Sequence, residues 1–340
     1  MANLYELMDP AVLTAVVREE PEPAGIALSE ILPDRLITDL DAAWDDITQT
    51  NAAATFRAFD AETPIGARDN ATRKSAEMLA VGEKYLLGEY DRLKLQAMQT
   101  GGDVTPLLQD AIFNDARRGA NAVRIRAEVA RGDVLQNGVL AINENDVNVS
   151  YDYGVPAGNL RTASASFYTT STDIPAELDA HFAAVSDEVE EDGIMWVSRK
   201  VARYLAMNTK YQALASVGGV TPPRLSLGDI NAAHDRLGFP EVRVYDSSFT
   251  VAGSSARVLP EDDIIFTPRN ASDLGFTGWG VTAEALELAE ASRLAFSDAP
   301  GLTGLVIQEG DPVKRWTKVT GICLPVITAP NKLSTLNVTP

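Results

Sequence analysis

A pattern of apolar residues at helical spacing runs through the middle of the chain, from Thr105 to Gly138. Thr105 suits an N-cap, Pro106 suits the first turn, and Gly138 suits the position just past the end. We predict one helix of about 32 residues, roughly 48 Å long, with a face of small residues that can approach a sheet closely. That face consists of Leu108, Ile112, Ala116, Gly119, Val123, Ala127, Ala130 and Val134.

The same helix holds the one basic concentration of the chain, between residues 117 and 131. By helical spacing its arginines fall mostly away from the small-residue face. They are Arg117, Arg118, Arg124, Arg126 and Arg131. Two interpretations stay open, a solvated helix face and a contact surface. For a contact surface, an acidic segment of a neighbouring subunit is slightly favoured over nucleic acid.

Residues 1–50 combine eleven acidic residues with short apolar patches, against only two basic residues, Arg18 and Arg35. Prolines 21, 23 and 33 separate the patches. The segment is too apolar for a solvated tail and too interrupted for a domain core. We predict an arm that needs another surface to cover its apolar side; an acidic, flexible terminus is the alternative.

Residues 52–78 are polar and short of helix signals. Phe56, Phe59 and Ile65 surround the turn-like stretch 60–64. This pattern predicts two extended strands joined at a tip, a projecting hairpin of about 25 residues.

The second half of the chain reads as a mixed helix and strand unit that begins near Asp173. Ser226 and Asp229 form a capping box at the start of a helix that Gly238 ends. Apolar positions near the C-terminus predict that the end of the chain is anchored. Further predictions are a hairpin of 147–153 with 163–170, a buried strand at 194–198, a helix at 199–207, strands at 242–245, 258–259 and 264–266, and an alternating strand at 316–327.

Charge and composition narrow the function. With 48 acidic and 29 basic residues, the net charge of −19 argues against a protein that neutralises many phosphates. A single cysteine forms no internal disulfide, and a reducing, cytosolic origin is expected. Neither a signal sequence nor a run of eighteen apolar residues is present, so neither secretion nor membrane insertion is indicated.

No catalytic, cofactor or metal motif stands out. Gly218-Gly219 lacks the lysine and hydroxyl residue of a phosphate loop. His181 and His234 are typical of helix-surface or core-edge residues, and neither has a nucleophile motif. The carboxylate clusters at 187–192 and 261–263 are typical of solvated helix and turn ends. A pair of carboxylates that acts as acid and base stays open as the alternative. We predict no cofactor, no metal and no enzymatic activity.

The order of these parts resembles the phage major capsid proteins of the lambda E family, with the Hong Kong 97-like fold. The textual likeness is greatest in 117–142 (RRGANAVRIRAEVARGDVLQNGVLAI), 275–284 (GFTGWGVTAE) and 310–338, where GDPVKRW leads into an alternating strand and LSTLNV. By order of elements it covers about residues 50–340.

This resemblance implies an α+β capsid fold with an N-terminal arm at 1–45, an extended loop at 46–78, a peripheral domain with a spine helix at 79–172, an axial domain at 173–299, and a return to the peripheral domain at 300–340. It implies hexamers and pentamers in an icosahedral shell, with a scaffolding protein or protease, a portal, a decoration protein and weakly bound double-stranded DNA as partners, assembly in the host cytoplasm, and a place in the virion. Candidate intersubunit contacts are Trp44, Phe56, Phe59, Ile65, Arg117, Arg118 and Arg124.

Some members of this fold weld neighbours by an isopeptide bond between a loop lysine and an asparagine. Here the loop carries Arg57, Arg68 and Arg73, and its one lysine, Lys74, is near the base. Such a cross-link is therefore not expected. Two other functions remain as alternatives: a cellular nanocompartment shell of the same fold, and a cytosolic hydrolase that uses a carboxylate pair.

Overall fold

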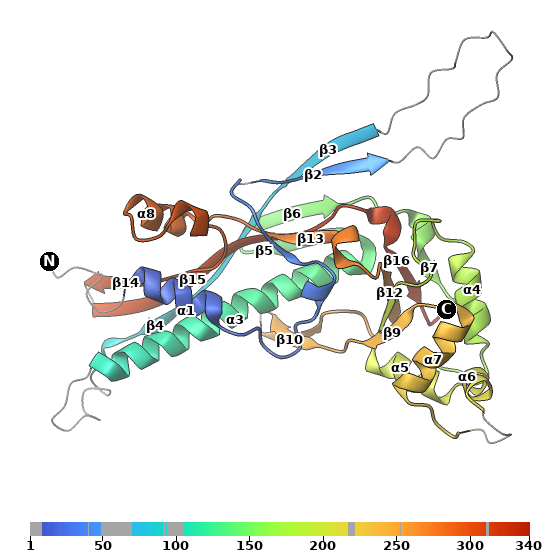
Figure 1. The fold of residues 1–340 in the computed structure, drawn as a ribbon. Coiled ribbons are helices and arrows are strands. Elements are labelled where there is room, and N and C mark those ends of the chain that lie inside the picture. Colours follow the sequence, from blue (N-terminus) through green and yellow to red (C-terminus); the bar gives the residue numbers. More distant parts are fainter. Residues whose placement is uncertain are drawn as a thin grey trace, which may run out of the picture.

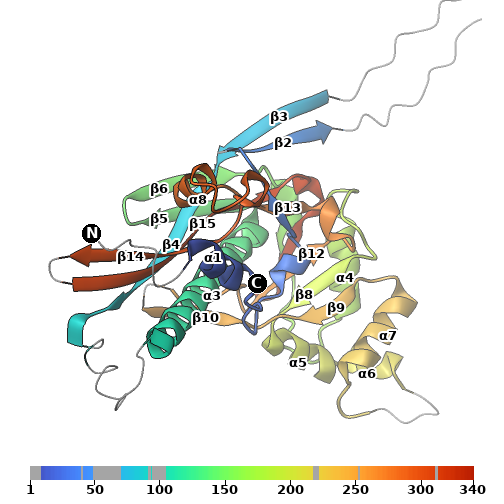
Figure 2. The same ribbon diagram turned by 60° about the vertical axis from the view of Figure 1, so that its left-hand side comes forward.

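Two β-sheets organise the part of the chain that the computed structural model describes. Figures 1 and 2 show a first lobe built on one sheet and the long helix α3 (Thr105–Asn137), a second lobe that carries several short helices, and a hairpin that projects from the body. Within the described ranges, no helix has both the length and the hydrophobicity to cross a bilayer. These ranges are residues 9–39, 41–48, 70–90, 93, 105–216, 222–251, 253–310 and 313–340.

The first sheet is built around the long strand β15 (Val313–Ile327). One end of β15 pairs with β14 (Thr303–Gly310) and β4 (Leu79–Leu87), and the other end pairs with β13 (Gly275–Trp279), all antiparallel. β1 (Asp34–Leu36) adds to β13 in parallel. The predicted strand at 316–327 is thus confirmed as the centre of the sheet.

Helix α3 confirms the prediction of a single long helix with a small-residue face. The residues of this face from Ile112 to Val134 are buried against the sheet, chiefly against β15. A Cβ added at Gly119 would lie 2.7 Å from a methyl of Val319, so only glycine allows this approach. Gly138 ends the helix with a φ of +72°, which favours glycine. Leu108 also belongs to this face by its spacing, but its side chain is not among those that the structure describes.

The acidic N-terminal segment packs on its own subunit. Asp9 caps helix α1 (Pro10–Glu19), whose side chains Leu13 and Val17 are fully buried between α3 and β14. The short helix η1 (Leu28–Glu30) follows before β1. The predicted need for another surface is therefore met for residues 10–36 by the body of the same chain, and a role of the segment between subunits stays a prediction.

The projecting hairpin consists of β2 (Asp41–Thr48) and β3 (Asn70–Glu77), paired antiparallel from Asp41 opposite Glu77 to Thr48 opposite Asn70. Figure 1 shows it leaving the upper side of the body, above the strands β5 (Val139–Glu144) and β6 (Val147–Asp152). The hairpin starts eleven residues before the predicted position, Ala52, since β2 begins at Asp41. Phe56, Phe59 and Ile65, with Arg57 and Arg68, lie outside the described residues.

A second hairpin covers the end of α3. It joins β5 (Val139–Glu144) to β6 (Val147–Asp152) through Asn145 and Asp146, which both have positive φ. The predicted pairing of 147–153 with 163–170 is wrong, because the chain enters a strand directly after Gly138 and gives β6 a nearer partner.

The second lobe is built on a sheet with the order β7-β16-β12-β8-β9. β8 (Ile194–Val197) is buried along its whole length, as predicted, and the capping box at Ser226 and Asp229 starts α7 (Leu227–Leu237). Its other strands are β7 (Leu160–Thr162), β9 (Glu241–Val244), β12 (Asp263–Thr267) and β16 (Ser334–Asn337), and its other helices are α4 (Ile174–Phe182), α5 (Arg199–Met207) and α6 (Thr209–Leu214).

Smaller elements complete the described chain. They are the hairpin of β10 (Ser248–Val251) with β11 (Ser254–Arg257), helix α8 (Ala283–Glu290), and the short helices η2 (Ala157–Asn159), η3 (Ala271–Asp273), η4 (Phe296–Asp298) and η5 (Pro330–Lys332). The strand predicted at 258–259 is replaced by β11 just before it.

The two sheets exchange segments across the predicted domain limits. β13 falls within the predicted range 173–299 but lies in the first sheet, and β16 falls within 300–340 but lies in the second. Leu333, Leu336 and Val338 are buried, which confirms that the C-terminus is anchored. The lobes therefore share the chain more closely than a simple insertion would.

We predict that Leu13→Ala destabilises the isolated subunit by about 2–5 kcal/mol, because it leaves a cavity between α1, α3 and β14. Val12→Ala on the same helix is the matched control, since Val12 is 50% exposed. Denaturant unfolding of both variants checks this. Equal stability of the two variants would contradict packing of α1 on its own subunit.

Candidate subunit-contact surfaces

Two arginines of α3 bind the end of α1. The guanidinium of Arg124 donates to the carbonyl oxygens of Val17 and Arg18, at 3.3 and 3.1 Å, and to that of Glu20. These are the unpaired carbonyls at the end of a helix, where a cation is favourable. Arg117 lies 3.2 Å from the carboxylate of Glu20. Both arginines thus contact an acidic segment, but in this subunit, and their role between subunits stays a prediction.

Arg118 lies on the exposed side of α3. Its charge lowers the pKa of Asp115, although burial raises that pKa by more. A contact of Arg118 with another subunit therefore remains a prediction.

Arg131 departs from the polar face on which the sequence places it. It is buried: its Nε donates to the hydroxyl of Thr277 at 2.8 Å, and its two terminal nitrogens pair with Glu128 and Asp34. A buried arginine needs such partners, because a lone charge away from water costs several kcal/mol. The prediction that Arg131 belongs to a surface patch is wrong.

Glu128 is the acceptor at the centre of this cluster. One carboxylate oxygen accepts the backbone N–H groups of Ala27 and Leu28, at 2.8 and 2.9 Å, and the hydroxyl of Tyr245 at 2.8 Å. Burial and the neighbouring Glu128 raise the pKa of Tyr245. The N-terminal segment, α3 and the chain after β9 are thereby held together by one carboxylate.

Trp44 anchors the base of the projecting hairpin. Its ring packs against Tyr153, with ring centroids 5.8 Å apart, and the hydroxyl of Tyr153 donates to the carbonyl of Pro325 at 2.6 Å. Tyr151 donates to the carbonyl of Glu77 at 3.0 Å on the other strand. Two aromatic residues of the chain after α3 thus fix where the hairpin leaves the body.

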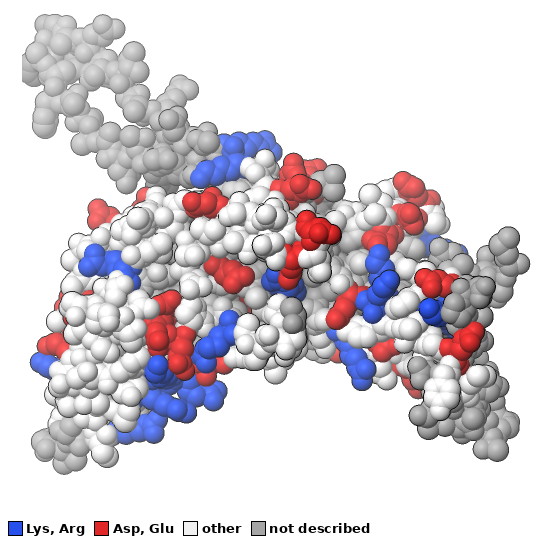
Figure 3. All heavy atoms as spheres, turned by 180° about the vertical axis from the view of Figure 1, so that it is seen from behind, with Lys and Arg blue, Asp and Glu red and all other residues white. Residues whose placement is uncertain are grey.

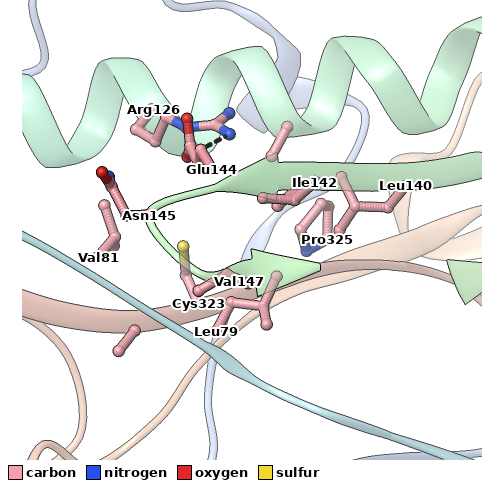
Figure 4. A pocket seen from close by; sticks show the side chains of 12 residues that line it. Leu79, Val81, Arg126, Leu140, Ile142, Glu144, Asn145, Val147, Cys323 and Pro325 are labelled. Carbon is pink, nitrogen blue, oxygen red and sulfur yellow. Dashed lines mark hydrogen bonds and ion pairs between the residues drawn. The ribbon is translucent and has the colours of Figure 1, made fainter. Parts of the chain in front are cut away.

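A cavity of about 130 Å³ lies between the β5–β6 hairpin and the first sheet. Figure 4 shows Leu79, Ile142, Val147 and Cys323 around it, with Arg126 and Glu144 paired at one end. Burial raises the pKa of the Cys323 thiol to about 12, so the thiol is protonated and unreactive at neutral pH. Most residues that line the cavity are apolar, and its two charged side chains pair with each other.

Both histidines are core residues, not surface or edge residues as the sequence suggests. His234 lies between the hydroxyl of Tyr211 at 2.8 Å and the carbonyl of Pro240 at 2.6 Å. His181 lies 3.1 Å from the hydroxyl of Ser334, and burial lowers its pKa to about 4. Among the described residues, no group of three or more metal-ligating side chains comes together.

Solved structures of capsid proteins and of a phage-related protein have the same fold. The putative capsid protein of a prophage of Escherichia coli CFT073 matches with a TM-score of 0.65 and 15% identity, over 98% of this chain and 99% of that one. A phage-related protein of Bordetella bronchiseptica RB50 matches with a TM-score of 0.55 and 13% identity, over 96% of both chains. The capsid of Myoviridae phage XM1 matches with a TM-score of 0.50 and 10% identity, over 93% of both.

These likenesses define the class of protein: the fold is the Hong Kong 97-like fold of phage capsid proteins. The family of phage major capsid protein E matches residues 9–336, and the chain belongs to this family. No curated protein sequence matches the chain. The protein is thus a shell-forming major capsid protein with a structural role, and its place is the virion.

We predict that Arg131→Leu lowers the free energy of unfolding of the isolated subunit by roughly 3–5 kcal/mol, because it leaves Glu128 buried with a charge and no cation. Arg126→Ala is the matched control on the same helix: its pair with Glu144 is partly exposed, so about 0–1 kcal/mol is expected. Denaturant unfolding at neutral pH measures both. A small loss for Arg131→Leu would contradict a buried charge pair.

We also predict that His181 makes the subunit less stable in acid. Its pKa is about 4 in the folded chain against an ordinary 6.5, so the unfolded chain binds more protons between these values. The free energy of unfolding should therefore fall as the pH drops from 6.5 towards 4, by up to roughly 3 kcal/mol.

His181→Gln should remove this part of the pH dependence and leave that of the other groups in place. Urea unfolding of both proteins at a series of pH values gives the two slopes. Parallel curves for wild type and variant would show that His181 does not contribute.

Proposed function

We propose that copies of this chain form hexamers and pentamers that close an icosahedral head around double-stranded DNA. The observation that carries this proposal is the β2–β3 hairpin, which projects from a body whose own core is already complete. A two-stranded ribbon standing off the body has too little surface of its own to be stable alone. A neighbouring subunit is the natural surface for it.

We assign the domains of the capsid fold to the two sheets and the hairpin. The first sheet with α3 corresponds to the peripheral domain, the second lobe to the axial domain, and β2–β3 to the extended loop. Contacts between subunits through Trp44, Phe56, Phe59, Ile65, Arg117, Arg118 and Arg124 are part of the proposal. Trp44, Arg117 and Arg124 already have partners within the subunit, so they would act by orienting the hairpin and the N-terminal segment.

Partners other than copies of the chain follow from the same proposal. They are a scaffolding protein or protease, a portal and a decoration protein, met during assembly in the host cytoplasm. The charge of −19 supports weak contact with DNA, because tight phosphate binding requires concentrated Lys and Arg and would hinder packaging and release.

The lattice is proposed to be noncovalent. Lys74 lies in β3 opposite Trp44, near the base of the hairpin, where it is poorly placed to reach a distant neighbour. Arginine does not replace it as a nucleophile, because the guanidinium stays protonated. Burial of apolar surface, at about 25 cal/mol per Å², would then hold the shell.

We predict that the expressed chain forms particles visible by electron microscopy, and that these particles yield single chains in denaturing electrophoresis. Lys74→Arg should give the same particles and the same single band. A monodisperse monomer in light scattering under every salt and scaffold condition would refute shell formation. A ladder of covalent multimers that Lys74→Arg abolishes would refute the noncovalent lattice.

A further inference from the structure

A basic groove of about 300 Å³ opens on the second lobe, between α5, α7 and the end of β9. Its floor is apolar and includes Leu227 and Val244, each 41% exposed. Three arginines line it: Arg199, Arg203 and Arg224. The groove thus combines exposed apolar surface with a concentrated positive charge.

The sequence of α5 explains how the arginines come to line the groove. Ser198 caps the helix, Val201 and Leu205 are buried beneath it, and Arg199 and Arg203 fall on the exposed side. Figure 3 shows Lys and Arg side chains gathered over this part of the second lobe. A basic site of this kind on a chain with a net charge of −19 should attract an acidic partner.

Two of the three arginines are available to such a partner. Arg199 faces Asp246 at 3.7 Å. Arg203 and Arg224 are exposed, and within the described part of the chain neither forms an ion pair. Among the described residues, no acidic side chain therefore neutralises the charge of these two arginines.

Every copy carries an acidic segment at the other end of the same sheet. Residues 187–192 lead into β8, whereas α5 follows directly after β8. A strand of four residues spans roughly 13 Å, so the segment and the groove lie at opposite ends of β8. The segment includes the exposed side chains Asp187, Glu188, Glu191 and Asp192.

The acidic segment is held in place by its own subunit. Val189 is buried, Glu188 accepts from the side chain of Asn331 at 3.2 Å, and Glu190 accepts the backbone N–H of Arg269 at 3.0 Å. Ala183 and Ala184, just before it, are exposed and apolar. The segment is therefore held by its own subunit, and its exposed carboxylates, those of Glu191 and Asp192 among them, lie near a small apolar surface. Negative charge and apolar surface together complement the groove.

We propose that the acidic segment 187–192 of one copy docks into the arginine groove of the next copy. The two surfaces differ and lie at opposite ends of β8, so the contact is head to tail. Repetition of one such contact closes a ring when the rotation from copy to copy completes a full turn, as the proposed hexamers and pentamers require. This inference rests on the proposed function and identifies which surfaces of the second lobe join neighbours. The apolar floor favours a protein surface over nucleic acid, whose phosphates would leave Leu227 and Val244 uncovered.

A charge exchange tests the contact. Arg203→Glu/Arg224→Glu and Glu191→Arg/Asp192→Arg should each reduce the yield of assembled particles at least roughly tenfold, because like charges then meet at every contact of the ring. The chain with all four substitutions should regain particles, since each groove again meets a complementary segment. Electron microscopy and sedimentation velocity measure the yield, and circular dichroism establishes that each subunit is folded.

Lys210→Glu/Arg236→Glu is the control, with the same charge change on the same lobe but outside the groove. It also removes the partly exposed pair of Lys210 with Asp173 and the bond of Arg236 to the carbonyl of Leu214, and it should still assemble normally. Wild-type particles together with normal particles from Arg203→Glu/Arg224→Glu would overturn this inference alone. A wild-type chain that stays monomeric would overturn it together with the proposed function. Unchanged assembly with loss of binding to a short DNA duplex in the groove variant would overturn it in favour of a nucleic-acid contact.

Discussion

The buried carboxylate of Glu128 is the interaction on which the arrangement of the subunit depends. It accepts hydrogen bonds from the N-terminal segment, from Arg131 one turn along α3, and from Tyr245 after β9 of the second lobe. Arg131 carries the network on to Asp34 and Thr277. A charge removed from water needs all of these partners. The positions of the two lobes and the N-terminal segment are therefore set together.

This network can close only because α3 approaches its neighbours closely. A Cβ added at Gly132 would lie 2.2 Å from the carbonyl oxygen of Val258, and one at Gly119 would meet Val319. Larger residues would push the helix away from the sheet by more than a hydrogen bond tolerates. The small-residue face is therefore a condition for the buried charges, not only for apolar packing.

Local sequence signals predicted individual helices and strands. Contacts between residues far apart in the sequence determined strand pairing and the burial of charged side chains. The long helix, the capped α7 and the buried β8 follow from punctuation and periodicity, which act within a few residues. The local pattern predicts that Arg131 lies on the surface. Its burial depends on Asp34, which lies 97 positions earlier and is therefore invisible to a local pattern. The exchange of β13 and β16 between the sheets has the same cause, since strand partners far apart in sequence leave no local trace. The candidate contact residues Phe56, Phe59 and Ile65 lie outside the described ranges.

Arginines that are paired within the subunit limit the electrostatic attraction between subunits. Arg117, Arg124 and Arg131 neutralise acidic or carbonyl groups of their own chain, so they add little attraction towards a neighbour. Copies with a charge of −19 repel one another. Association must then come from apolar burial and from exposed cations that have no ion pair among the described residues, such as Arg203 and Arg224. Because these two arginines line one groove, they can determine the direction in which copies join even where they contribute little of the total free energy.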